Sequence, residues 1–246
     1  MNVDLMHLKD LWQQAFGDPS DAIDAFFSTG FSPDRCHYLL ECGRPVSALY
    51  WLDCTLDGQK FAYLYAIATE ASHRGKGLCR RLMTETHEIL RKQGYAGAVL
   101  VPAEKALFSL YEKLGYRHAA TNREFACKAA DTPAALTPID ARRYEKLRPQ
   151  YLPAGSVLQA GATLDFYATY GQLYAGDDFL LACYVEDDKL YAQEILGSVA
   201  RCDQILCALG AKAGAFRTPG EEKPFAMYYP LKENCPAPRY LGFDLA

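Results

Sequence analysis

The chain has 246 residues, of which 50% are hydrophobic and 13% aromatic, so it can bury one large core or two small ones. The formal net charge of -4 argues against a nucleic-acid partner. No apolar run reaches the length of a membrane span, and residues 1–12 follow an amphipathic helical pattern without the apolar segment of a signal peptide. We therefore expect a cytoplasmic protein with no membrane partner.

Two helices and an antiparallel strand pair open the chain. Leu5, Leu8, Leu11, Trp12, Ala15 and Phe16 recur at helical spacing. Residues 17–20, Gly-Asp-Pro-Ser, end this first helix and begin a second that runs to about Phe27. Residues 36–41 and 45–55 predict two strands joined by a tight connection, and the Asp57-Gly58 turn leads into the next strand.

The stretch Tyr63–Arg81 predicts a strand, a glycine turn and a helix in succession. Residues 63–69 alternate between two apolar faces, as in a strand covered on both sides. Residues 74–77, Arg-Gly-Lys-Gly, form the turn, and residues 78–93 follow helical spacing up to Gly94. A helix start of this kind presents unpaired amides that bind phosphate.

The charges of this turn support a phosphate ligand. Arg74, Lys76, Arg80 and Arg81 lie at the positive end of the helix dipole, and no carboxylate occurs until Glu85. Each such cation costs about 0.3–1 kcal/mol unless an anion neutralises it. We therefore expect a multiply charged phosphate ligand here; the alternative is a solvated basic helix start with two incidental glycines.

Further along, residues 97–101 predict a buried strand parallel to the strand before the turn, residues 104–114 a helix, and Tyr116 the start of another strand. The RGKGLC sequence at residues 74–79 and the LYEKLGY sequence at residues 110–116 together resemble the motifs of the GNAT superfamily of acyl-CoA-dependent N-acyltransferases. Arg74 and Gly77 match the first motif, whereas Cys79 departs from its final glycine or alanine. The resemblance covers about residues 1–128.

The resemblance implies an α/β fold with a mixed, mostly antiparallel sheet and flanking helices. It also implies that Tyr111 protonates the departing CoA thiolate; the alternative is an aromatic side chain of the helix face that packs on the core. Backbone groups of the central strand would pair with the pantetheine arm of acetyl-CoA, and the turn would hold the pyrophosphate. The implied cofactor-binding residues are Ile67, Ala68, Thr69, Arg74, Gly75, Lys76, Gly77, Leu78 and Cys79.

One role that the resemblance implies has no residue here. Several members of the family carry a catalytic glutamate on the central strand, where this chain has Tyr63. The base is then Glu70, Asp53, a residue of the second half or a chain of water molecules. Each carboxylate has an alternative explanation as a solvated loop or strand-end group.

Residues 131–138 have the composition of a linker. Beyond them we expect helices at 140–151 and 163–173, a hairpin of 178–186 with 190–196, a helix at 199–209, and strands around 213–217, 225–231 and 240–245. This order repeats that of the first half. We therefore expect a tandem arrangement: a GNAT catalytic domain at residues 1–130 and a degenerate GNAT-like α+β domain at residues 131–246.

The second half also allows expectations about the sites. Residues 196–199, Leu-Gly-Ser-Val, have neither paired glycines nor basic residues, so we expect a single cofactor site. The second half is expected to complete the first sheet and to form a wall of the acceptor pocket. Arg217, Tyr228, Tyr229 and Glu194 are candidates for reaching that pocket, although a Pro-Gly hairpin at 219–220 and ordinary strand positions also explain them.

The cysteines and histidines suggest no further site. Nine cysteines form no Cys-x-x-Cys pair, and the five histidines do not cluster with them, which favours free buried thiols and no metal.

These observations predict an N-acetyltransferase that transfers an acetyl group directly from acetyl-CoA, its cosubstrate, to a primary amine. The acceptor is a small-molecule amine or a peptide amine, and the protein is a monomer or a homodimer. Two alternatives stay open: a non-catalytic acyl-CoA sensor or regulatory protein, and a structural module that has lost CoA.

Overall fold

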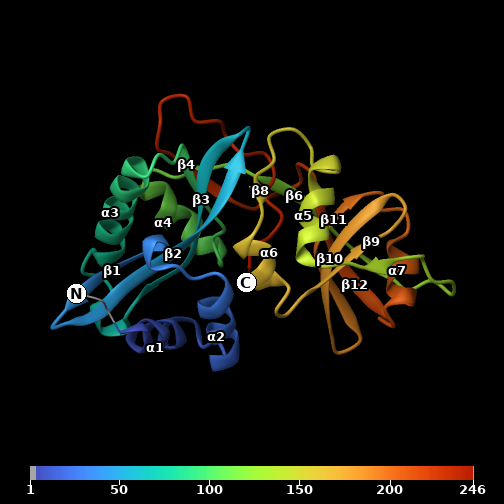
Figure 1. The fold of residues 1–246 in the computed structure, drawn as a ribbon, viewed down its shortest axis with the longest axis horizontal. Helices are drawn as coiled ribbons and strands as arrows, with labels where there is room; N and C mark the ends of the chain where they lie inside the picture. The colour runs from blue at the N-terminus through green and yellow to red at the C-terminus, as the bar shows by residue number, and fades with distance from the viewer. Residues whose placement is uncertain (1–3, 246) are drawn as a thin grey trace.

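A computed structural model describes residues 4–245; Met1–Val3 of the expected first helix lie outside them. Two twisted sheets stand side by side, with helices on their outer faces and also between them (Figure 1). The first sheet has the strand order β1-β2-β3-β4-β14-β5, with β8 paired to β2. The second has the order β13-β6-β12-β11-β10-β9-β7. The mixed α/β fold with two mostly antiparallel sheets agrees with the expected fold class.

The first half follows the predicted order of elements closely. Its helices are α1 (Leu5–Phe16), α2 (Ser20–Thr29), α3 (Leu78–Lys92) and α4 (Lys105–Lys113), with short 3₁₀ turns at Pro33–Arg35 and Ala71–His73. Its strands are β1 (Cys36–Glu41), β2 (Arg44–Leu56), β3 (Gln59–Thr69), β4 (Gly97–Leu100), β5 (Arg117–His118) and β6 (Thr121–Lys128). Helices α1 and α2 pack on one face of the first sheet, and α3 and α4 on the other.

The second half contains shorter elements. Its helices are α5 (Ala141–Leu147), α6 (Ala162–Tyr167) and α7 (Cys202–Ala208), with a 3₁₀ turn at Arg148–Gln150. Its strands are β7 (Thr137–Pro138), β8 (Leu158–Gln159), β9 (Gln172–Ala175), β10 (Phe179–Glu186), β11 (Lys189–Gly197), β12 (Ala213–Pro219), β13 (Lys223–Pro224) and β14 (Met227–Pro230). The predicted β10–β11 hairpin is confirmed, with Asp187 and Asp188 in its turn.

Strand β3 contains a bulge that the sequence pattern did not predict. Tyr50 of β2 lies opposite Tyr65, but Ala48 lies opposite Ala68, so β3 has one extra residue. Ala66 takes a φ of 47° there. The predicted strict alternation is therefore wrong beyond Tyr65: Ala66 packs on the α1 and α2 side, and Ile67 on the α3 side.

The two sheets exchange strands. β14, from the end of the chain, pairs antiparallel with β4 and with β5, and so completes the first sheet as expected. β6, from the first half, pairs antiparallel with β12 in the second sheet. Each sheet therefore contains strands from both sides of residue 130, the boundary that we expected between the two domains.

Two expected elements of the second half are different. The run 240–245 is not a strand; within it Tyr240 forms only an isolated bridge with Ser156. Most of these residues are apolar because the segment is buried between the sheets, although it pairs with no strand. The expected helix at 163–173 ends at Tyr167, and residues 172–175 form β9.

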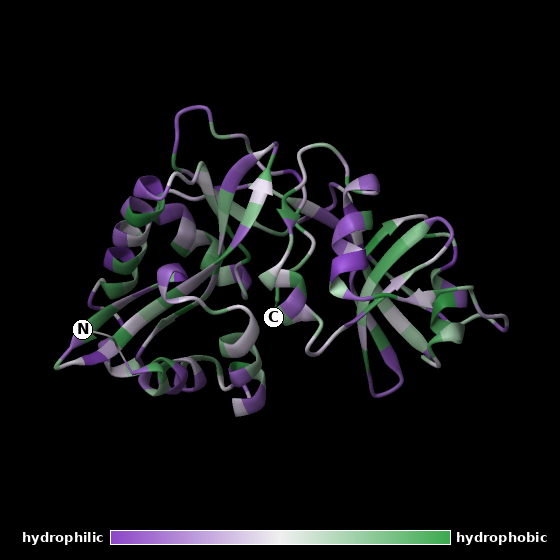
Figure 2. Cartoon of the chain, viewed as in Figure 1, coloured by the Kyte–Doolittle hydropathy of each residue, from purple (hydrophilic) through white to green (hydrophobic). Residues whose placement is uncertain are grey.

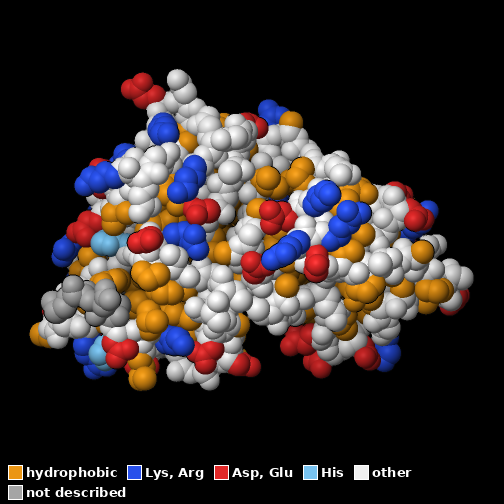
Figure 3. Space-filling model, in the orientation of Figure 1, with side chains coloured by type: hydrophobic (Ala, Val, Ile, Leu, Met, Phe, Trp, Pro, Cys, Tyr) orange, Lys and Arg blue, Asp and Glu red, His pale blue; other side chains and the backbone are white. Residues whose placement is uncertain are grey.

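A single core joins the inner faces of the sheets. It contains α1 residues such as Trp12, α6 residues such as Leu164, and the β3 residue Tyr63. In Figure 2 the helices carry polar residues on their outer sides. Basic and acidic side chains are interspersed over the face seen in Figure 3, in keeping with the small net charge.

Candidate active site

The turn before α3 has the backbone that the phosphate prediction requires. Gly75 and Gly77 both take a φ of 77°, a left-handed conformation that favours glycine. A Cβ at either position would meet no other atom within 4 Å, so the space above the turn is open. Gly77 caps α3 without a side-chain hydrogen bond, and the first turn of the helix contains no acidic residue. The start of this helix thus offers its amides to an anion.

The four cations around this turn have different partners. Arg81 Nε lies 2.7 Å from Glu85 Oε1. Arg74 Nε donates to the Thr69 carbonyl (3.1 Å), and Arg80 Nη1 to the Lys113 carbonyl (3.4 Å). A carbonyl oxygen positions a guanidinium without neutralising it. Among residues 4–245, a carboxylate therefore compensates Arg81 but not Arg74, Lys76 or Arg80.

Strands β3 and β4 separate next to this turn. Their parallel pairing ends at Tyr63 opposite Val99, while β3 continues to Thr69. Of the carbonyls expected to contact a pantetheine arm, that of Ala68 accepts from Ser47 Oγ (2.9 Å) and that of Thr69 from Arg74. A carbonyl oxygen has two lone pairs, so the Thr69 carbonyl retains capacity for a ligand, whereas Ala68 also pairs with Ala48 of β2. The structure thus brings the strand segment 67–69 and the turn 74–79 together.

Tyr111 lies on α4, on the same side of the first sheet as α3, and is 7% exposed. Burial and, to a smaller extent, the Cys79 thiol raise the pKa of the Tyr111 phenol well above its ordinary value. The phenol therefore keeps its proton at neutral pH. A group in this state can donate a proton to a leaving thiolate.

On the opposite side of β3, two tyrosines hold the C-terminal segment 240–245. The Tyr63 hydroxyl donates to the Asp244 carbonyl, and the Tyr65 hydroxyl to the Leu245 carbonyl (2.6 Å). Burial raises the pKa of both phenols. Tyr63 therefore stays neutral at physiological pH and does not replace a glutamate as a base.

The two acidic candidates near the first sheet already have partners. Glu70 Oε2 lies 2.9 Å from His73 Nδ1. Asp53 lies within reach of Arg35 (3.2 Å) and Lys60 (3.7 Å) and accepts from the Tyr95 hydroxyl. These contacts give both carboxylates a structural explanation.

We expected Glu194 as a candidate for reaching the acceptor pocket, but the structure buries it. Its side chain is fully buried and forms an ion pair with Arg148, which is also fully buried, at 2.8 Å. The Tyr144 and Tyr240 hydroxyls donate to the same carboxylate at 2.8 and 3.0 Å. A buried charge with this set of partners is a structural centre of the second half.

The other second-half candidates for the acceptor pocket lie on both faces of the first sheet. Tyr229 stacks on His87 of α3 with ring centroids 4.0 Å apart, on the side away from the second sheet. Tyr228 is buried in the core between the sheets. Arg217 lines a cavity there together with Asp244 and Glu124. Sequence reasoning missed the two carboxylates, because neither lies in a motif.

One comparison with known proteins matches most of the first half. Residues 3–119 match the family model described as an acetyltransferase (GNAT) domain. No curated protein matches the sequence.

Solved structures share the fold of nearly the whole chain. A GCN5-related N-acetyltransferase from Kribbella flavida superposes with a TM-score of 0.70 at 17% identity, over 92% of this chain and 69% of that one. A putative acetyltransferase from Pyrococcus horikoshii gives 0.63 at 13% identity, over 98% and 90%. A tandem GNAT protein from the clavulanic acid biosynthesis pathway gives 0.55 at 10% identity, over 94% and 95%.

These similarities extend through the second half and agree with a tandem arrangement. In the described residues, no helix combines the length and apolarity needed to cross a membrane.

Proposed function

From the GNAT domain of residues 3–119, we propose that the protein transfers the acetyl group of acetyl-CoA to a primary amine. The start of α3 is the observation that carries this proposal. It combines two left-handed glycines, a helix terminus without a side-chain cap, and cations that no carboxylate of the described residues compensates. A nucleotide pyrophosphate complements all three features.

The cosubstrate supplies an activated acyl group as a thioester. The amides of residues 75–79 would hold its pyrophosphate, with Arg74 and Lys76 adding positive charge. The edge of β3 beyond Tyr63 has no partner on β4, so its backbone groups would pair with the pantetheine arm. A backbone amide of the same edge would polarise the thioester carbonyl.

In the proposed reaction the acyl carbon forms a bond to the amine nitrogen and its bond to sulfur breaks. Tyr111 gives its proton to the departing sulfur, and the protons lost by the amine pass to water and back to the phenol. The Tyr111 phenol is protonated before each turnover, as a proton donor must be.

The experiment compares the wild-type protein with Tyr111→Phe, measuring CoA affinity by calorimetry and thiol release in the presence of an amine panel. We expect the variant to bind CoA like the wild type and to turn over about 10²–10⁴ times more slowly. Tyr38→Phe is the matched control, because Tyr38 lies on β1 and packs on the opposite face of the first sheet from Tyr111.

Full activity of Tyr111→Phe would remove Tyr111 from the mechanism. A wild-type protein that binds CoA without releasing thiol with any amine would support the acyl-CoA sensor instead. Absence of CoA binding would leave only a structural role.

A further inference from the structure

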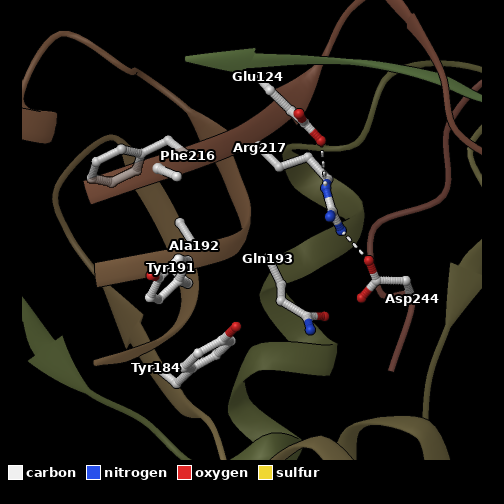
Figure 4. Close-up of a pocket in the computed structure, with 9 residues that line it drawn as sticks. Glu124, Tyr184, Tyr191, Ala192, Gln193, Phe216, Arg217 and Asp244 are labelled. Atoms are coloured by element: carbon white, nitrogen blue, oxygen red, sulfur yellow. Dashed lines mark ion pairs between the residues drawn. The ribbon is translucent and has the colours of Figure 1, made fainter. Parts of the chain in front are cut away.

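A cavity of about 220 Å³ opens where β11 and β12 separate. These strands pair in parallel from Lys189 to Ala192 and then diverge, and β11 carries an extra residue at Gln193. The second sheet thus repeats the bulge and the divergence of β3 and β4. Among the side chains that line this cavity are those of Tyr184, Tyr191, Arg217, Glu124 and Asp244 (Figure 4).

The charged lining of the cavity is acidic overall. Arg217 lies between Glu124 (3.6 Å) and Asp244 (2.9 Å), so one cation serves two carboxylates. Lys223 contacts Glu124 at 2.6 Å but does not line the cavity. The other oxygen of Asp244, Oδ1, is buried and has no hydrogen-bond partner within residues 4–245. Arg217 Nε and Nη1 also form no hydrogen bond there, although they face the two carboxylates. The buried Asp244 oxygen, which has no ion-pair partner of its own in the described part of the chain, favours a donor from a ligand.

Aromatic rings form another wall. Tyr184 and Tyr191 stack with ring centroids 5.2 Å apart and planes 19° apart, and their side chains lie beside the cavity in Figure 4. Aromatic faces attract cations and also cover apolar groups. Acidic and aromatic groups together are complementary to an ammonium ion attached to an apolar body.

The cavity also adjoins the proposed catalytic strand. Asp244 lines the cavity with its side chain, while its carbonyl accepts from the hydroxyl of Tyr63. Tyr63 is the last residue of β3 that pairs with β4. The Tyr63 side chain therefore connects the segment that carries Asp244 to the point of β3 where the first sheet opens.

We propose that this cavity binds the acceptor: a small primary amine, entering as the ammonium ion, with an apolar or aromatic body. The ammonium contacts Asp244 Oδ1, and the body packs against Tyr184 and Tyr191. The second sheet then recognises the acceptor, while the first sheet holds the acyl donor. This inference rests on the proposed function and specifies its acceptor.

The test uses calorimetry on the full chain with tyramine, phenethylamine and cadaverine, and with tyrosol, in which a hydroxyl replaces the ammonium of tyramine. We expect tyramine to bind about tenfold or more tightly than tyrosol, because a charge-assisted hydrogen bond is lost. In Asp244→Asn this preference should disappear. Tyr184→Leu should weaken tyramine and phenethylamine more than cadaverine. Glu221→Gln, an exposed acidic position outside the cavity, should change neither.

CoA affinity and thermal unfolding of each variant report on folding. If CoA binds and thiol release proceeds, but Asp244→Asn keeps the amine preference, or no amine of the panel binds, the acceptor site is elsewhere and the proposed transferase survives. If amines bind in the cavity but CoA does not bind the wild type, the transferase proposal fails while the amine site stands.

Discussion

The two sheets contain the same opening between parallel strands, but only the first leads into a glycine turn with the backbone proposed to bind phosphate. β3 and β11 each pair in parallel with a neighbour, carry a bulge and then diverge from it. After β3 come two left-handed glycines and the 15-residue helix α3. β11 ends at one such glycine, Gly197, and is followed by the 7-residue helix α7, with Asp203 in its first turn.

This difference shows that two diverging strands form a groove but do not determine which ligand the groove binds. The residues around each opening determine which ligand fits. At the first opening, the helix start is positive and has no carboxylate in its first turn. At the second, carboxylates and tyrosines line the cavity. Four predictions test this division, from the largest expected effect to the smallest.

Arg148→Met removes the cation at the centre of the second half. The Glu194 carboxylate would then be buried without its ion-pair partner, and we expect a loss of about 3–5 kcal/mol in the free energy of unfolding. Urea denaturation measures it. Arg148→Met combined with Glu194→Leu should be less destabilised than the single variant. An equal loss in both would attribute the effect to packing alone.

His87 makes the first half sensitive to acid. Burial, and then the charge of Arg91, lower the pKa of His87 to about 4, and the ring stacks on Tyr229 of β14. A depressed folded-state pKa stabilises the protein above about pH 6.5, and this stability is lost as the pH falls towards 4. The maximum contribution is about 3 kcal/mol. Urea midpoints between pH 7.5 and pH 5 should fall more for the wild type than for His87→Phe; parallel pH profiles would contradict the assignment.

Gly77→Glu and Ser198→Glu compare the two helix starts directly. At Gly77 the new side chain is strained at a φ of 77° and places a carboxylate where the phosphate would bind. We expect CoA affinity to fall at least about a hundredfold, or about 2.8 kcal/mol. Ser198→Glu, at the corresponding junction of the second sheet, should leave it unchanged. Calorimetry measures the CoA affinity of both variants. A loss of CoA affinity in both would mean that both junctions contribute to CoA binding.

Tyr63→Phe should have the smallest effect. It removes one hydrogen bond to the Asp244 carbonyl, a change of about 1 kcal/mol. Its clearest consequence should be a higher KM for the amine at unchanged CoA affinity, since Asp244 would shift. Tyr65→Phe, which removes the hydrogen bond to the Leu245 carbonyl instead, is the control. An unchanged KM for the amine in Tyr63→Phe would show that Tyr63 does not influence amine binding in the cavity.

The sequence predicted the turn 74–77 and the helix after it to within one residue, because glycines and helical periodicity are local signals. It did not predict the bulge at Ala66, since alanine carries no mark of a positive φ. Nor did it show that Glu194 is buried, because an ion pair with Arg148 joins residues 46 positions apart. Of the charged residues that line the cavity, the sequence indicated Arg217 but not Glu124 or Asp244, because these residues meet only in the folded chain.

The placement of β14 has a consequence for biosynthesis. A ribosome must translate residues 227–230 before the strand beside β4 can form, and β6 waits for β12 in the same way. Folding during translation therefore stays incomplete until nearly the entire polypeptide has emerged. A nascent chain that ends near residue 130 would expose β4 and β6 as unpaired edge strands, which favours chaperone binding or aggregation with other nascent chains.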